Sequence, residues 1–404
     1  MSNNVKTPGK KCVLTINGGS SSIKFALYEV DLRLNQLLSG EVENIGQKNA
    51  GMRFKTPGHH QQHKIDITAD GYESAANWLI DWLEKQVDFE VVKGIGHRVV
   101  QGLDHTKPEK ITDELLDDLK KISAYDPEHL PEEIKMISIF RNRYPELVQI
   151  ACFDTSFHTT MPPVAKLLAI PRRFQAEGIK RYGFHGLSYS YLMEQLDLEE
   201  WNETAGDRVI LAHLGNGASL AAVKEGKSID TSMGFSPAAG LPMGTRTGDI
   251  DPGVAWYLIK NQALSPKQFN HLINHESGLL GISETSADMR ELLKTQGADR
   301  RAAEAVELFC YQTKKWIGSF AAALNGIDTL VFSGGIGENS PEVRERICDG
   351  LQFLGIELDK QKNLNNKPII SADISTVSVR VIPTNEELMI AKSVCHILNY
   401  NIKN

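Results

Sequence analysis

The first part of the chain carries two short apolar runs on either side of a turn rich in small polar residues. The run Cys12–Ile16 ends at Asn17–Gly19, and a second run, Ile23–Leu27, begins after three serines. This pattern predicts a strand, a glycine-rich turn and a second strand. Small residues let backbone N–H groups approach an anion, and the serine hydroxyls and Lys24 add donors and charge, so the turn is a candidate phosphate site. Ordinary hairpins also carry glycine and serine in their turns, so the turn alone leaves both interpretations open.

Farther along the chain, segments with a helical apolar period alternate with short apolar runs. The first pattern predicts helices and the second predicts strands, because side chains repeat about every 3.6 residues around a helix and every two along a strand. The predicted helices are Tyr72–Lys85, Thr112–Ile122, Glu132–Tyr144, roughly Gly253–Asn261, Ser265–Asn274, Ser286–Thr295 and Arg301–Asn325, and finally Glu387–Leu398. The predicted strands lie at Val91–Val100, within Val148–Phe157 and at Val377–Pro383, after a region of strands and turns that extends to about Ile67.

The plan of the first hairpin returns in the second half of the chain. Arg208–Val223 again has the pattern of a strand, a glycine-rich turn and a strand, and placing Val13 on Val209 puts Gly19 on Gly215 without a gap. This weak internal repeat predicts two domains of related topology. We therefore expect two phosphate-binding hairpins that face one another across a cleft.

Length, charge and cysteine content narrow the class of protein. A chain of 404 residues with 41% apolar residues is long enough for two domains, and we expect their boundary near Met161-Pro162-Pro163. The net charge of −7 predicts no basic surface for nucleic acid or anionic lipid. The five cysteines form no Cys-x-x-Cys pair, and no apolar run is long enough for a signal peptide or a membrane span. We therefore expect a cytoplasmic globular protein with free thiols.

Two further patterns in the sequence are not assigned to a binding site. His59, His60 and His63 have no neighbouring carboxylate or cysteine, so we interpret them as an exposed loop rather than a metal cluster. The run Gly226-Lys227-Ser228 is not a Walker motif, because Ala221 stands where its first glycine belongs.

Several charged side chains follow or interrupt apolar segments. Arg98 lies among apolar residues, where a charge without a partner is costly, so we expect it to face a cleft. Asp154 ends an apolar strand, and the carboxyl edge of an α/β sheet is where such a carboxylate meets a ligand, although a cap or turn residue would look the same. Arg246 lies in the tightest part of a long loop, residues 233–253, which favours a functional role. His185 stands beside a glycine, and the sequence alone does not separate a functional histidine from one that begins a helix.

The last third of the chain adds a third glycine-rich turn and a pair of glutamates. Thr329–Asn339 predicts a strand, a glycine turn and a helix that Ser340-Pro341 opens, and such a turn places backbone amides against a nucleotide. The strand at Val377–Pro383 ends shortly before Glu386 and Glu387. A carboxylate there, beside phosphate-binding turns, is well placed to hold Mg²⁺ directly or through water.

Together these motifs make the chain resemble the acetate kinase family, within the superfamily that includes actin, Hsp70 and hexokinase. The resemblance spans nearly the whole chain, and the motifs follow one another in the family's order. The matching segments are residues 17–24, 97–100, 153–158, 182–186, 213–217, 243–246, 334–339 and 383–387.

The resemblance implies an α/β, two-domain actin-like ATPase (ribonuclease H-like) fold with duplicated topology and a central cleft. It places one actin-like domain at residues 1–158, with a C-terminal helix at about 387–404 packing back on it. The second, nucleotide-binding domain would be residues 159–386. A homodimer is implied as well.

The activity that the resemblance implies is reversible phosphoryl transfer from ATP to acetate, with Mg²⁺ or Mn²⁺, giving acetyl phosphate and ADP. The catalytic residues would be Asp154, His185 and Arg246. The substrate-binding residues would be Arg98 for the carboxylate and Val100, Ala124, Phe184 and Pro237 for the alkyl end. The metal would lie at Asn17 and Glu386. The nucleotide-binding residues would be Lys24, His213, Leu214, Gly215, Asn216, Gly217, Asp288, Met289, Arg290, Gly335, Ile336, Gly337, Glu338 and Asn339.

The chain also departs from the family pattern, and the departures bear on the acyl specificity. Gln101-Gly102-Leu103 stands where His-Gly-Gly is usual, Ala124–Pro127 stands for Leu-His-Asn-Pro, and Tyr189 stands where histidine is usual. They leave the phosphoryl-transfer residues whole and leave propionate open as the alternative substrate. A non-catalytic, nucleotide-responsive protein of the Hsp70 kind would need neither Arg98 nor Arg246. Because a carboxylate is already ionised at neutral pH, no general base is required, and we interpret Asp154 as orienting an arginine or metal-bound water.

Overall fold

The computed structural model describes residues 10–19, 22–56, 63–198 and 207–402. The chain forms two compact units. Unit 1 comprises the chain up to Ser156 together with the segment from Asn385 onward, and unit 2 comprises Phe157–Thr384. The chain therefore leaves unit 1 once and returns to it for its last helix.

Unit 1 contains, in its described residues, an eight-stranded mixed sheet with the strand order β5-β4-β3-β2-β1-β6-β8-β7. The strands are β1 (Cys12–Gly18), β2 (Ile23–Val30), β3 (Leu34–Glu43), β4 (Gly51–Lys55), β5 (His63–Asp66), β6 (Val92–Val99), β7 (Glu109–Lys110) and β8 (Gln149–Phe153). Neighbours from β1 to β5 pair antiparallel, whereas β1, β6 and β8 run parallel. The parallel part brings the ends of β6 and β8 to one edge of the sheet.

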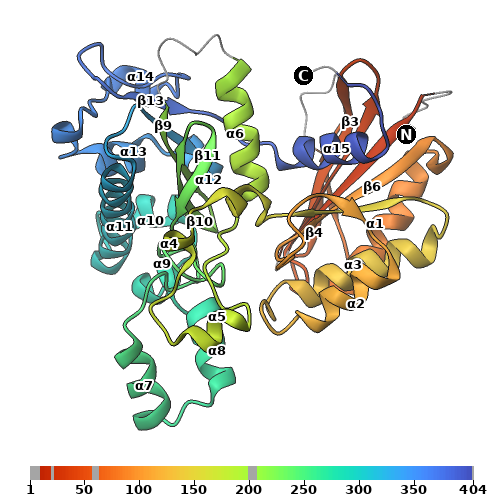
Figure 1. Cartoon of the computed structure of the whole chain (residues 1–404), viewed down its shortest axis with the longest axis horizontal. Helices are drawn as coiled ribbons and strands as arrows, with labels where there is room; N and C mark the ends of the chain where they lie inside the picture. Colours follow the sequence, from red (N-terminus) through yellow and green to blue (C-terminus); the bar gives the residue numbers. More distant parts are fainter. Residues whose placement is uncertain (1–9, 20–21, 57–62, 199–206, 403–404) are drawn as a thin grey trace. The chain divides into compact units, whose positions relative to one another are not determined.

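The helices of unit 1 cover both faces of this sheet (Figure 1). They are α1 (Tyr72–Gln86), α2 (Asp113–Lys121), α3 (Leu130–Arg143) and α15 (Glu386–Ile397). Helix α15 packs directly on β6, and a Cβ added at Gly94 would lie 2.9 Å from Leu398 Cδ1 and from Val394 Cγ1. Glycine at this strand position thus lets the last helix lie close to the sheet.

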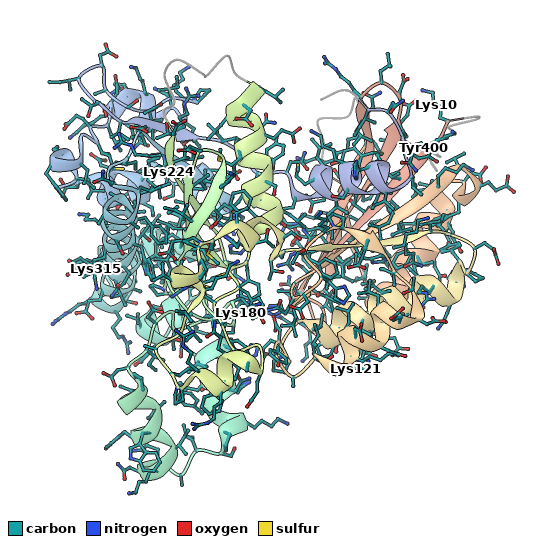
Figure 2. All side chains as sticks on the ribbon, in the orientation of Figure 1. Lys10, Lys121, Lys180, Lys224, Lys315 and Tyr400 are labelled. Atoms are coloured by element: carbon teal, nitrogen blue, oxygen red, sulfur yellow. The ribbon has the colours of Figure 1, made fainter. Side chains whose placement is uncertain are left out.

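The core of unit 1 lies between the sheet and helices α1 and α3, where side chains fill the space (Figure 2). Alternate residues of the strands, such as Leu14 and Phe25, pack against Leu79 of α1 and Phe140 of α3. Burial of such side chains contributes roughly 1.5–3 kcal/mol each before entropy is counted. The first hairpin is therefore held in place by this core, and the end of β1 lies at the sheet edge that carries Arg98.

Unit 2 is built, in its described residues, on a five-stranded sheet with the strand order β11-β10-β9-β12-β13. The strands are β9 (Arg208–Leu214), β10 (Ala218–Lys224), β11 (Lys227–Thr231), β12 (Thr329–Ser333) and β13 (Ser378–Val381). The helices are α4 (Pro163–Lys166), α5 (Arg172–Ala176), α6 (Gly186–Leu198), α7 (Pro252–Asn261), α8 (Pro266–His275), α9 (Gly278–Ser283), α10 (Met289–Thr295), α11 (Arg300–Leu324), α12 (Gly334–Asn339), α13 (Pro341–Cys348) and α14 (Lys360–Leu364). Over the described ranges, no helix is both long and apolar enough to cross a membrane.

The two sheets share a five-strand plan. In unit 2, β11, β10 and β9 are antiparallel neighbours, and β9, β12 and β13 run parallel. In unit 1, β3, β2 and β1 are antiparallel neighbours, and β1, β6 and β8 run parallel. The duplicated topology expected from the alignment of Val13 with Val209 is therefore confirmed.

Most predicted elements are confirmed to within a few residues, and the differences have local causes. The predicted glycine turn after β12 is itself the short helix α12, because Ser333 is its N-cap and the glycines form its first turn. His63 does not lie in a loop: it opens β5 and its ring stacks on Phe54. His59, His60 and the serines at 20 and 21 lie outside the described residues. Helix α10 begins at Met289, three residues later than predicted, because Asp288 caps it.

Candidate functional site

In unit 1, Arg98 and Asp154 form an ion pair at the ends of neighbouring parallel strands. Arg98 lies near the end of β6, and Asp154 directly follows β8. Arg98 Nη2 lies 2.7 Å from Asp154 Oδ2, and Nη1 donates a 3.2 Å hydrogen bond to the Gly18 carbonyl. Burial alone would lower the pKa of Arg98, but the charges of Asp154, Glu133 and Glu386 and the hydrogen bond to Asp154 together outweigh burial and raise it. The Arg98 side chain remains 12% exposed, so a fixed positive charge reaches solvent at this edge of the sheet.

Glu133 on α3 places a second buried carboxyl group beside Arg98. Its Oε1 lies 3.6 Å from Arg98 Nη1, and its Oε2 accepts a 2.9 Å hydrogen bond from the Val100 N–H. Among the described residues, neither Oε1 nor the buried hydroxyl of Tyr72 has a hydrogen-bond partner. Burial raises the pKa of Glu133 to about 8, and the charge of Arg98 opposes that shift. The Glu133 carboxyl group is therefore mostly neutral at neutral pH.

Asn17, at the end of β1, meets two carboxylates from the start of α15. Its Nδ2 donates hydrogen bonds to Glu386 Oε2 at 2.9 Å and to Glu387 Oε1 at 3.3 Å. Lys24 is the cross-strand partner of Asn17. Burial lowers the pKa of Lys24, but the charges of nearby carboxylates, Glu386 and Glu387 foremost, outweigh burial and raise it. For the Glu387 carboxyl group, burial raises the pKa. The structure thus brings together the predicted metal residues and Lys24, and it adds Glu387.

The side chains of Asn17, Glu386 and Glu387 fit a hard divalent cation, since one amide and two carboxylates supply the oxygen ligands that Mg²⁺ takes. The fit is partial. In the part of the chain that the structure describes, no group of three or more His, Cys, Asp or Glu side chains is placed to hold a metal ion. A cation at Asn17 and Glu386 would therefore need water or substrate oxygens to complete its coordination.

In unit 2, three glycine-bearing segments lie against one another: the turn after β9, the loop before α7, and α12. The Gly244 N–H donates a 3.1 Å hydrogen bond to the Asn216 carbonyl. Gly334 has a φ of +76°, and a Cβ there would lie 2.7 Å from the Leu214 carbonyl oxygen. Glycine is required at this point because a side chain would meet both backbone strain and a clash. The predicted nucleotide segments at 213–217 and 335–339 are thereby neighbours.

His185 lies immediately before α6 and is held by a serine and a second histidine. Its φ of +58° is a left-handed conformation that is uncommon for a residue with a side chain. Its Nδ1 lies 2.8 Å from Ser219 Oγ, and its ring stacks on that of His213 with centroids 4.3 Å apart. A Cβ built on Gly217 would lie 3.3 Å from His185 Nε2 and 4.0 Å from Arg246 Nη1. The imidazole and the guanidinium therefore approach the same glycine.

The nucleotide segments are tied together by hydroxyl groups and one carboxylate. Ser188 Oγ lies 2.8 Å from His213 Nδ1, and the Thr384 hydroxyl donates to Ser188 Oγ at 2.8 Å. Glu338 Oε1 accepts the N–H groups of Gly334 and Thr384 at 2.9 and 3.1 Å. The side chain of Glu338 is therefore engaged inside unit 2 and fixes the shape of α12.

In the predicted segment 288–290, Arg290 has the most exposed side chain. Asp288 accepts the Arg290 N–H at 2.8 Å, and the two side chains form an ion pair at 2.5 Å. Met289 is buried, so its side chain belongs to the core of unit 2. The Arg290 side chain is 84% exposed, which leaves it as the member of this segment that can reach a ligand.

The residues expected around the substrate's alkyl end divide between the units. In unit 1, Val100 is buried and Ala124 is exposed in the turn between α2 and α3. In unit 2, Phe184 and Pro237 are buried, and the Pro237 carbonyl accepts a 3.3 Å hydrogen bond from Arg246 Nη1. Of the four, Ala124 alone presents an exposed side chain.

Comparison with known proteins places these motifs in one family. The model of the acetokinase family matches residues 12–392. The chain belongs to the acetokinase family. It is 41% identical to an acetate kinase of Rickettsia akari over 391 residues, covering 96% of this chain and 100% of that protein. It is 42% identical to a propionate kinase of Citrobacter rodentium over 394 residues, covering 95% and 96% of the two chains. A crystal structure of a propionate kinase from Francisella tularensis is similar, with a TM-score of 0.87 at 38% identity, covering 96% of this chain and 100% of that one.

Membership of the acetokinase family fixes the reaction class. The protein is a phosphotransferase, an acetate or propionate kinase with ATP as co-substrate, and it has the actin-like ATPase fold. The similar proteins carry both substrate names, so the family alone does not separate acetate from propionate.

Some residues of this acetokinase site were not expected from its sequence. Glu133 could have been noticed, because it shares a helical stripe with the buried residues Ile137 and Phe140. Ser219 and Glu387 carried no such signal, since the first lies in an apolar strand and the second follows a glutamate already assigned.

Proposed function

We propose that this chain catalyses the Mg²⁺-dependent, reversible transfer of the γ-phosphoryl group of ATP to acetate, and that it accepts propionate with comparable efficiency. The observation that carries the proposal is Arg98: a guanidinium fixed by Asp154, flanked by Glu133 and open to solvent. A short carboxylate is the ligand that such a cation binds best, because two parallel N–H···O bonds match its geometry.

The carboxylate needs no general base, because its oxygen is already ionised at neutral pH. Arg98 would bind and orient it, with Asp154 keeping the guanidinium in place. The cost of bringing two anions together would be offset by positive groups rather than by proton transfer. Asp154 is therefore assigned to orientation and not to proton abstraction.

On the phosphoryl side, His185 and Arg246 would meet the charge that develops in the transition state. Transfer spreads negative charge over three equatorial oxygens, and donors fixed beforehand stabilise it without reorganisation. The approach of both side chains to Gly217 supports this assignment. The proposal requires residues of both units to act on one pair of substrates.

The remaining predicted residues would hold the nucleotide and the metal. The segments 213–217 and 335–339, with Lys24 and Arg290, would bind ATP through backbone N–H groups and positive charge. Asn17, Glu386 and Glu387 would hold Mg²⁺ directly or through water. When bound, the cation neutralises phosphate charge.

The acyl preference would depend on the turn that carries Ala124. Leucine is typical of acetate kinases at this position, so alanine removes about three heavy atoms from the wall of the acyl pocket. Each substrate methylene buried in that space is worth on the order of 0.8 kcal/mol, or about fourfold in kcat/KM. We therefore expect propionate to approach or exceed acetate. Tyr125, which is half-buried beside Ala124, is the side chain that could fill the space and restore acetate preference.

The test is acyl phosphate trapped with hydroxylamine from protein, MgATP and acetate, propionate or butyrate. We expect Ala124→Leu to shift the ratio of kcat/KM toward acetate, with Ser123→Ala, a neighbouring change in the same turn, as its control. An unchanged ratio in Ala124→Leu would show that position 124 does not line the pocket. No acyl phosphate from any carboxylate would overturn the proposed reaction.

A homodimer is part of the same proposal. Helix α7 exposes large apolar side chains, with Trp256 64% and Tyr257 54% exposed. Such a patch is typical of an interaction surface. Sedimentation at two protein concentrations tests the dimer directly.

The five cysteines are buried free thiols, which supports the cytoplasmic location that we also propose.

A further inference from the structure

Tyr189 lies one helical turn after His185, and its hydroxyl reaches the same serine. Its N–H donates a 3.0 Å hydrogen bond to the His185 carbonyl, so the two residues stand at positions i and i+4 of the first turn of α6. The Tyr189 hydroxyl and Ser219 Oγ are within hydrogen-bond distance, and Ser219 Oγ lies 2.8 Å from His185 Nδ1. A phenol, a serine hydroxyl and an imidazole therefore form one continuous chain.

The phenol and the serine hydroxyl of this chain are closed off from water, and His185 at its end is half-buried. Tyr189 and Ser219 both have no exposed surface, and Tyr189 belongs to an apolar cluster with Leu192 and Val209. The ring of Tyr189 also meets the His158 ring edge-on, with centroids 5.6 Å apart. In such surroundings a polar network has to be fully paired, and its hydrogens take one ordered direction.

We propose that Tyr189 and Ser219 are positioning residues that set the tautomer of His185: the phenol donates to Ser219 Oγ, and Ser219 donates to His185 Nδ1. The reason is the order of acid and base strength. A phenol is a better donor than an aliphatic hydroxyl, and an imidazole nitrogen is the best acceptor of the three groups. Because a serine hydroxyl has one hydrogen, donation to Nδ1 requires it to accept from the phenol. The hydrogen of the neutral imidazole is then on Nε2.

This tautomer matters for the site because of where His185 Nε2 lies. Nε2 is the His185 atom nearest the virtual Cβ of Gly217, the glycine that Arg246 Nη1 also approaches. The stacked His213 ring and the Nδ1 contact keep the imidazole from turning over. An N–H donor is thereby held beside the guanidinium without the imidazole having to be protonated. This inference rests on the proposed role of His185 at the transferred phosphoryl group and adds how that donor is maintained.

The tautomer can be measured without any substrate. In protein labelled with ¹⁵N only at histidine, the His185 signals are identified by their loss in His185→Gln, at about pH 8.5, above the ordinary histidine pKa of about 6.5. We expect an unprotonated Nδ1 and a protonated Nε2 in the wild type. In Tyr189→Phe, which keeps the ring contacts, Ser219 becomes free to accept, and we expect protonated Nδ1 to increase. Ser219→Ala should abolish the preference.

Tyr191→Phe is the matched control, because it removes a phenol hydroxyl from the same helix two residues away. A protonated Nδ1 in the wild type, or a pattern unchanged in Tyr189→Phe, would overturn the inference. In kinetics, Tyr189→Phe should lower kcat about tenfold with both KM values nearly unchanged, since about one hydrogen bond to the transition state is weakened. A wild-type protein that makes no acyl phosphate would overturn the proposed reaction but leave the tautomer measurement standing.

Discussion

Two arginines, one in each unit, are held in opposite ways: Arg344 is buried and Arg98 is half-buried. Arg344 on α13 has no exposed surface, and its guanidinium makes five hydrogen bonds to neutral groups. The acceptors are the carbonyls of Gly337, Glu338 and Asn363 and the side-chain oxygens of Asn363 and Asn366. Arg98 makes two hydrogen bonds, one of them to Asp154, and has Glu133 within 4 Å. Arg344 is therefore held by many hydrogen bonds to neutral groups, and Arg98 mainly by the opposite charge of Asp154.

The number of donors still available separates a structural arginine from one that can bind a ligand. A guanidinium has five N–H donors, so the five bonds of Arg344 use them all. Burial among neutral acceptors lowers the pKa of Arg344 to about 10, whereas the nearby carboxyl groups, Asp154 foremost, together raise that of Arg98 against burial. Arg344 therefore holds α12 against α14 and the segment that follows it. Arg98 keeps donors and a stable charge for a carboxylate.

The largest effect expected from this comparison is that of Arg98→Lys. Lysine retains the charge beside Asp154 but loses the planar fork, so kcat/KM for acetate and propionate should fall by roughly 10³. The KM for ATP should change less than about threefold, because the guanidinium does not touch the nucleotide in the proposed reaction. Hydroxamate assays give both constants. A loss of less than about tenfold would remove Arg98 from the substrate site.

Arg344→Met should give the opposite result, a loss of stability with the carboxylate constants kept. Five acceptors lose their donor at once, and we expect a loss of roughly 3 kcal/mol in the free energy of unfolding. The KM for ATP should rise, because Arg344 Nη1 holds the Gly337 and Glu338 carbonyls of α12. Urea unfolding and ATP titrations measure the two effects. Arg346→Met, on the same helix but with a side chain that is only half-buried, is the control.

The sequence predicted the elements that local pattern determines and missed contacts that only the fold creates. Apolar spacing predicted α1 and α11 to within a residue or two, and the aligned hairpins predicted the duplicated sheet. Asp154 was expected at the carboxyl edge of the sheet, where α/β folds carry ligand-binding residues. Arg98 was expected to face a cleft, because a charge among apolar residues is costly without a partner. Their pairing depends on the parallel register of β6 and β8, which links Val99 to Phe153.

The partners of these residues could not be read from the chain in the same way. Glu133 meets Arg98 across 35 positions, and Ser219 meets His185 across 34. Neither contact belongs to a motif, and each depends on how a helix lies on a sheet. Arg344 carried no signal either, since an arginine on a short amphipathic helix is usually exposed.

The smallest expected effect is a pH dependence of carboxylate binding at Arg98, which the neighbouring Glu133 would cause. Burial raises the pKa of Glu133 from its ordinary value of 4.5 to about 8. The charged and titratable groups around it are Arg98 on β6, Asp154 after β8, Tyr72 on α1 and Asp126 before α3. In the folded state the carboxyl group binds its proton more tightly than in the unfolded chain. The stability it contributes is therefore complete below about pH 4.5 and is lost as the pH rises through about 8.

Ionisation of Glu133 also places a negative charge 3.6 Å from the guanidinium that would bind the substrate. Above about pH 8 we expect the KM for acetate to rise about fivefold, because roughly 1 kcal/mol of repulsion is reasonable for charges partly screened by solvent. Glu133→Gln keeps an oxygen for the Val100 N–H and stays neutral, so its KM should remain flat over the same range. Glu132→Gln, the exposed neighbour, should follow the wild type. If Glu133→Gln instead shows the wild-type rise in KM, another group titrates, and the second carboxyl group beside Arg98 serves packing alone.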